Sequence, residues 1–168
     1  SDSGDPMKPV VREIAGVRDL LPLAAMIPQR YPGLLESVAL GNARCRYDIL
    51  FAFPQAALRL DACDGVSDAH ARQVGTNFLD ALDGAWKAKR IPHSDHAGLP
   101  FRGGWLLYLG YELAAEIEPS LSLPPSRSGL PIALALRCPA AIVVDRELHR
   151  TVLVAEQGCD ELLDRLQA

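Results

Sequence analysis

Short runs of alternating apolar and polar residues, bounded by proline and glycine, most restrict what this chain can fold into. Cys45–Phe53 is one such run, with aromatic or aliphatic side chains at every second position, and Ala57–Ala62 follows it after a proline. Because successive side chains of a strand point to opposite faces of a sheet, this period of two predicts two half-buried strands. Strands joined by so few residues pair antiparallel.

The rest of the chain fits the same architecture. Further strands are expected at Val10–Val17, Leu34–Leu40, Trp105–Tyr111, Ile132–Cys138, Ala140–Val144 and Thr151–Ala155. The main helix is predicted over Ser67–Arg90, where apolar residues recur every three or four positions, and shorter helices over Asp19–Met26 and Glu161–Leu166. Trp105–Tyr111 is almost wholly apolar, which predicts a strand covered on both faces. Together the elements predict an α+β fold of mainly antiparallel sheets with a few helices.

The composition describes one domain-sized unit. Of 168 residues, 49% are hydrophobic and 23% are charged, which is enough apolar surface for a core without disulfide or metal staples. Residues 1–8 are expected to be a flexible tail and residues 9–168 the folded part. The net charge of −4 and the lack of a basic stripe argue against a nucleic-acid partner. No apolar stretch approaches the ~20 residues that cross a bilayer, so no membrane partner is expected.

The 4 cysteines lie far apart in sequence, and none is paired at the spacing of a zinc site. No signal-peptide pattern precedes the chain. We therefore expect reduced cysteines and a cytoplasmic protein. Gly103–Gly104 lacks the further glycines of a dinucleotide-binding loop, so it predicts a bulge or a close backbone approach.

Glu36 interrupts an apolar strand, and a carboxylate there must face water or find a partner. Two interpretations remain open. In the first, Glu36 lies on the exposed face of a half-buried sheet. In the second, Glu36 and Ser37 form the polar floor of a small-ligand site. Arg46, Tyr47 and Asp48 on the next strand would be its wall, a combination that suits a zwitterionic aromatic amino acid.

Three segments resemble one known family in its order along the chain. They are Tyr31-Pro32-Gly33-Leu34-Leu35-Glu36-Ser37 with the following Ala43–Pro54, then Leu99-Pro100-Phe101-Arg102-Gly103-Gly104 continuing to Leu113, and finally Ala141–Arg146. The segments are similar to the L-L-E-S and R-[YF] strands, the P-F-x-G-G…G-Y-[DE] segment and the Asp-ending strand of the chorismate-utilising component I enzymes. These enzymes are anthranilate synthase component I and aminodeoxychorismate synthase component I.

The resemblance implies the N-terminal part of the anthranilate synthase component I-like fold. Asp48 stands where the anthranilate form tends to have serine, which favours aminodeoxychorismate synthase, an enzyme of para-aminobenzoate and folate synthesis. Anthranilate synthase component I, of tryptophan biosynthesis, is the alternative. A stand-alone regulatory domain that binds an amino acid is the alternative from another class.

The resemblance also implies where the chemistry lies. The family binds chorismate and Mg²⁺ in a larger C-terminal part absent from these residues, so no catalytic or metal-binding residue is expected here. Apolar surface is expected to be exposed where that part would pack. The resemblance further implies a glutaminase component as partner and is compatible with a homodimer. A tryptophan-type pocket is expected at Leu35, Glu36, Ser37, Arg46 and Tyr47.

Overall fold

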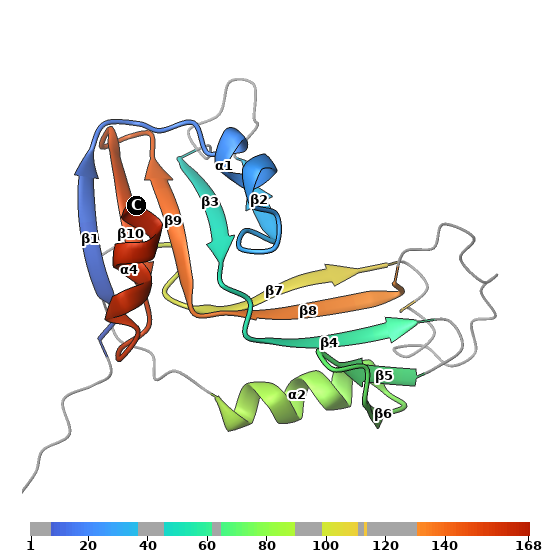
Figure 1. Cartoon of the computed structure of the whole chain (residues 1–168). Helices are drawn as coiled ribbons and strands as arrows, with labels where there is room; N and C mark the ends of the chain where they lie inside the picture. Colours follow the sequence, from blue (N-terminus) through green and yellow to red (C-terminus); the bar gives the residue numbers. More distant parts are fainter. Residues whose placement is uncertain (1–7, 37–45, 62–64, 90–98, 111–112, 114–130) are drawn as a thin grey trace, which may run out of the picture. The chain divides into compact units, whose positions relative to one another are not determined.

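The computed structural model describes residues 8–36, 46–61, 65–89, 99–110, 113 and 131–168. The chain divides into two compact units. The first unit contains residues 1–54, 91–104 and 138–168, and the second contains residues 55–90 and 105–137. Two five-stranded antiparallel sheets with three helices make up the described elements (Figure 1), so the predicted fold class is confirmed.

The first sheet has the strand order β1-β10-β9-β3-β2. Its strands are β1 Val10–Ala15, β2 Gly33–Leu35, β3 Tyr47–Ala52, β9 Ala140–Asp145 and β10 Arg150–Ala155. Every residue of the central strand β9 is buried, because the strand is paired on both sides and covered on both faces. The predicted strands at 10–17, 140–144 and 151–155 are confirmed, with β1 at the edge of the sheet.

One face of this sheet packs against two helices, α1 (Leu21–Met26) and α4 (Asp160–Gln167). This core includes Leu50, Ile142, Val144 and Leu153 from the strands and Leu162, Leu163 and Leu166 from α4. Leucines three or four positions apart lie on one side of a helix, which is why the C-terminal helix was predictable. On the opposite face, Leu99 packs against Val143, Val152 and Val154.

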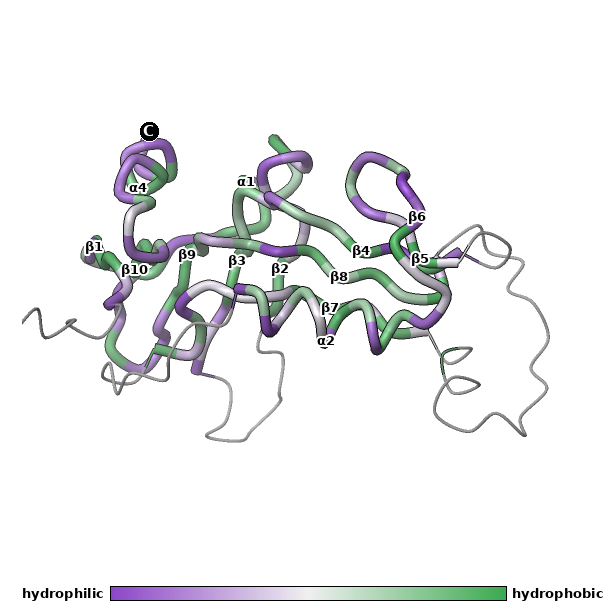
Figure 2. The backbone as a smooth tube through the Cα atoms, turned by 90° about the horizontal axis from the view of Figure 1, so that it is seen from below, coloured by the Kyte–Doolittle hydropathy of each residue, from purple (hydrophilic) through white to green (hydrophobic). Residues whose placement is uncertain are grey.

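The second sheet has the order β6-β5-β4-β8-β7 and is accompanied by α2 (Phe78–Ala88). Its strands are β4 Ala56–Asp61, β5 Gly65–Asp68, β6 Gln73–Gly75, β7 Gly104–Leu109 and β8 Ala133–Cys138. Hydrophobic and hydrophilic residues alternate along α2 (Figure 2), and Phe78 is fully buried against Val66 and Ala135. The side chain of Asn77 caps α2 by accepting a hydrogen bond from the Asp80 N–H at 3.0 Å.

The prediction of one helix over Ser67–Arg90 is wrong at its N-terminal half. Ser67 and Asp68 end β5, and a tight turn leads to β6 before the helix begins at Phe78. The Asp68 carboxylate accepts hydrogen bonds from the N–H groups of His70 and Arg72 at 2.9 and 3.0 Å. An aspartate can satisfy the free amides of a turn as well as those of a helix N-terminus, so the residue alone does not distinguish the two structures.

The expectation that Trp105–Tyr111 is covered on both faces is also wrong for the described residues. β7 is an edge strand, and Leu107, Tyr108 and Leu109 are 45%, 45% and 52% exposed. An apolar run shows that a strand needs cover but not which residues supply it. The exposed apolar surface that the family resemblance predicted is therefore present at this edge.

Phe53, which follows β3, has a left-handed φ of 58° and donates its N–H to the Arg30 carbonyl at 2.8 Å.

Gly103 provides the close backbone approach that the double glycine predicted. Its φ is 104°, and a Cβ at this position would overlap Oε1 and Cγ of Glu156. We expect Gly103→Ala to lower the free energy of unfolding by about 2 kcal/mol in urea denaturation, through backbone strain and steric overlap together.

Gly16 is the matched control, because its φ is 91° but nothing lies within 4 Å of the position that a Cβ would occupy. Gly16→Ala should cost about 1 kcal/mol, from backbone strain alone. In a Glu156→Ala background, the cost of Gly103→Ala should fall to that of Gly16→Ala. Equal costs of the two glycine substitutions in the unaltered background would contradict the steric argument.

Candidate functional site

Two of the residues predicted to line an amino-acid pocket, Leu35 and Tyr47, lie on neighbouring strands of the first sheet. Leu35 pairs with Ile49, and Tyr47 is two positions further along the same strand, so Leu35 and Tyr47 share a face. Leu35 and Glu36 are exposed and Tyr47 is half-buried. Exposure of Glu36 agrees with the first interpretation of this carboxylate. Ser37 lies outside the described residues.

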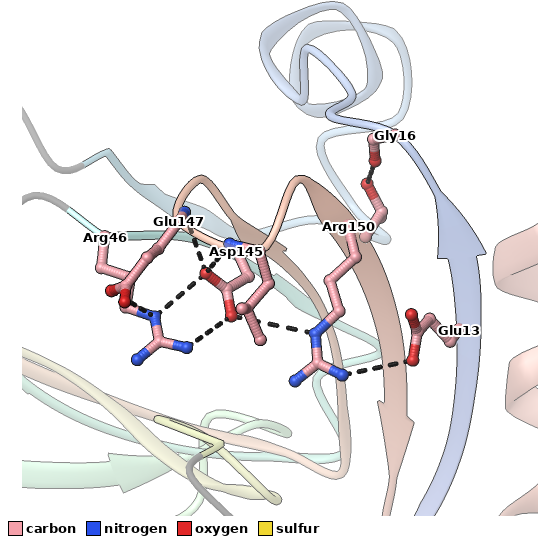
Figure 3. Close-up of polar contacts among 8 residues, drawn as sticks. Glu13, Gly16, Arg46, Asp145, Glu147 and Arg150 are labelled. Carbon is pink, nitrogen blue, oxygen red and sulfur yellow. Dashed lines mark hydrogen bonds and ion pairs between the residues drawn. The ribbon is translucent and has the colours of Figure 1, made fainter.

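Arg46, immediately before β3, is held by two carboxylates and an aromatic ring. Its Nε and Nη2 donate to the two oxygens of Asp145 at 3.0 and 2.9 Å, and Nε lies 3.3 Å from Oε2 of Glu147 (Figure 3). The guanidinium carbon lies 4.9 Å from the centre of the Tyr47 ring. A bidentate arginine–carboxylate pair is among the stronger polar contacts in proteins. The guanidinium of Arg46 is therefore bound firmly by side chains of the protein itself.

Asp145 is the centre of this arrangement. It ends β9, is only 1% exposed, and accepts the N–H groups of Glu147 and Leu148 at 3.1 and 3.2 Å, which closes the turn between β9 and β10. Arg150 lies 3.8 Å from the same carboxylate and 3.2 Å from that of Glu13 on β1 (Figure 3). We call Glu13, Arg150, Asp145, Arg46 and Glu147 the charged row.

Asp48 does not join the charged row. It points to the opposite face of the sheet, where one oxygen accepts from Nη2 and Nε of Arg146 at 2.7 and 3.1 Å. The predicted wall of Arg46, Tyr47 and Asp48 is therefore not one surface. Alternating strand geometry separates Tyr47 from Asp48, because neighbouring residues of a strand face opposite ways. Arg46 precedes the strand, and its guanidinium lies beside the Tyr47 ring and Asp145.

The protonation of the charged row follows from its contacts. The bidentate hydrogen bond from Arg46 lowers the pKa of Asp145, burial opposes this shift, and the turn amides add to it. The same hydrogen bond raises the pKa of Arg46. Both groups therefore stay charged throughout the neutral range, which suits a structural ion pair rather than an acid or base in catalysis.

The contacts of Arg46 set a condition for ligand binding at the predicted amino-acid pocket, but they do not test whether a ligand binds there. A ligand carboxylate at Arg46 would compete with Asp145 for the guanidinium. The pocket of Leu35, Glu36, Ser37, Arg46 and Tyr47 stays a prediction. Within the described ranges, no three His, Cys, Asp or Glu side chains are placed to share a metal ion, and none of the described helices is long and apolar enough to cross a membrane.

Sequence reasoning did not assign four residues of the charged row to a site, namely Glu13, Asp145, Glu147 and Arg150. A signal existed for Asp145, because an aspartate ending a wholly apolar strand needs a charged partner if it is buried. The identity of that partner was not visible, since Arg46 precedes Asp145 by 99 positions.

The first and third segments that carried the family resemblance, and the first six residues of the second, meet in the first unit. Residues 31–54 and 141–146 supply β2, β3 and β9, and residues 99–104 also belong to this unit. Phe101 contacts Phe51 of β3 edge to face, with ring centres 4.9 Å apart. The segments therefore contact one another through the Arg46–Asp145 ion pair and this aromatic contact.

We expect Asp145→Asn, which keeps the shape but removes the charge, to lower the free energy of unfolding by roughly 2 kcal/mol at pH 7. Because the folded-state pKa of Asp145 is lowered, its contribution is complete above the unfolded-state pKa of about 3.9 and is lost as the pH falls through the folded value. The difference between the variant and the unaltered protein should therefore shrink in acid, as measured by urea denaturation from pH 7 to pH 3.

The exposed pair of Arg59 and Asp61, whose atoms are 2.8 Å apart, provides the control. Asp61→Asn should change the free energy of unfolding by less than about 1 kcal/mol at pH 7, because exposed ion pairs contribute little. An Asp145→Asn effect as small as this, or one that does not depend on pH, would contradict the structural role of the charged row.

Comparison with known proteins shows which solved structures have a similar fold. No family model matches the sequence, and no curated protein matches it. Among solved structures 26 chains match, including anthranilate synthase component I from Streptococcus pneumoniae, with a TM-score of 0.55 and 22% identity. The match covers 86% of this chain and 32% of that one, so this chain spans about a third of that protein's length. The chain has the fold of the N-terminal region of anthranilate synthase component I.

Proposed function

We propose that this chain is the N-terminal region of an aminodeoxychorismate synthase component I, which aminates chorismate. The observation that carries the proposal is the fold match over 86% of this chain with a chorismate-utilising enzyme component. The meeting of residues 31–54, 99–104 and 141–146 in the first unit supports it independently, because the sequence alone identifies these parts of the family-like segments without reference to the fold.

Asp48 favours the aminodeoxychorismate enzyme over the anthranilate enzyme. The side chain of Asp48 is buried and pairs with Arg146 across β3 and β9. A serine, which the anthranilate form tends to have here, carries no charge to pair with an arginine. In this chain the aspartate at position 48, in place of that serine, thus forms an ion pair that a serine could not form.

In this proposal the chemistry takes place outside these residues. A C-terminal part would hold chorismate together with Mg²⁺, which requires carboxylates with open coordination positions. It would cover the exposed apolar residues of β7, Leu107, Tyr108 and Leu109, which lie in the second family-like segment. A glutaminase component would deliver ammonia, and a homodimer stays a prediction.

Product identity tests the proposal directly. We expect the complete protein, incubated with chorismate, ammonia and Mg²⁺, to form aminodeoxychorismate without releasing pyruvate, since that product keeps the enolpyruvyl group. The 168-residue chain alone should form no product under the same conditions. Mass spectrometry of the product and an enzymatic assay for pyruvate make the measurement.

The alternatives predict different results in the same assay. Anthranilate with one equivalent of pyruvate would replace our proposal by the anthranilate synthase assignment. A complete protein that leaves chorismate unchanged but binds an aromatic amino acid in calorimetry would instead support a regulatory domain without catalysis.

A further inference from the structure

Two arginines lie against one aromatic ring in the first unit. The guanidinium carbons of Arg30 and Arg165 are 5.3 and 4.4 Å from the centre of the Phe53 ring, and that of Arg30 is also 5.9 Å from the Tyr31 ring. The three elements involved are distant in sequence, since Arg30 precedes β2, Phe53 follows β3, and Arg165 lies in the last turn of α4. The two positive charges are therefore within about 10 Å of each other.

Neither arginine forms an ion pair with a carboxylate of the described residues. Other arginines do so, namely Arg12, Arg46, Arg59, Arg146 and Arg150. The one side-chain hydrogen bond of Arg30 to a described residue is a long one, 3.4 Å from Nη1 to the Arg165 carbonyl. Asp164, the acidic neighbour of Arg165, is already held by Arg12 at 2.9 Å. Two like charges so close together are stabilised by an anion between or beside them.

The ring orders both side chains for such an anion. A guanidinium that stacks on an aromatic ring keeps its N–H groups in the guanidinium plane, where they remain available to an oxyanion in bidentate geometry. Phe53 itself is held firmly, because its backbone has the left-handed φ of 58° and its N–H is bonded to the Arg30 carbonyl. A non-glycine residue in this conformation costs free energy and needs surrounding contacts to hold it.

We propose that Arg30 and Arg165, stacked on Phe53, form a binding site for the oxyanion group of a small molecule, a phosphate or a carboxylate. The site is separate from the charged row, where both arginines are already paired with carboxylates. It does not rest on the proposed synthase function, because all three residues lie within the first unit of this chain.

Calorimetric titration of the purified chain with inorganic phosphate and, separately, with citrate tests the site, with sodium chloride keeping the ionic strength constant. We expect saturable binding of at least one of the two, weakened about tenfold by Arg165→Gln. Arg165→Lys keeps the charge but loses the planar fork, so it should also bind more weakly than the unaltered chain. Tighter phosphate than citrate binding would identify a phosphate group as the ligand, and the reverse a carboxylate.

Arg18 provides the matched control, because it is an exposed arginine of the same unit that has no ion pair with a described carboxylate. Arg18→Gln should leave binding unchanged. Arg30→Gln should weaken binding as Arg165→Gln does, and circular dichroism should show that each variant is folded. Absence of saturable binding by both probes, or equal weakening by Arg18→Gln and Arg165→Gln, would overturn the proposal.

Discussion

The first unit depends on one buried carboxylate. Asp145 ends the central strand of its sheet at 1% exposure, where an unpaired negative charge would be strongly unfavourable. Arg46 neutralises it from the start of β3, and two amides of the β9–β10 turn complete its hydrogen bonds. Through Arg150 the same carboxylate is linked to Glu13 on β1, so the charged row connects four of the five strands.

The segments that resemble a chorismate-utilising family have a structural explanation in these contacts. Arg46 and Asp145 come from two of the segments, while Gly103 of the third allows the backbone to approach Glu156. Each of these contacts joins one part of the chain to another. The segments that carry the resemblance therefore supply contacts that hold the first unit together.

Most strands were predictable because the alternation of apolar and polar residues is visible in the local sequence, and a half-buried strand requires that alternation. The β5–β6 hairpin was missed for two reasons. Asp68 can accept the free amides of a turn as well as those of a helix N-terminus. In addition, the helical spacing of apolar residues in α2 extends in the N-terminal direction into the hairpin. The pairing of Arg46 with Asp145 was missed for a different reason. Strand order decides which distant side chains meet, and local patterns do not contain the order β10-β9-β3.

The central claim, that Arg46 serves the fold through Asp145, is tested most directly by a double-mutant cycle. The free energy of unfolding would be measured for Arg46→Gln, Asp145→Asn and the double variant, and the same cycle repeated on the exposed Arg59–Asp61 pair. We expect a coupling between Arg46 and Asp145 clearly larger than that of the exposed pair. Additive effects of Arg46→Gln and Asp145→Asn would contradict this role of Arg46.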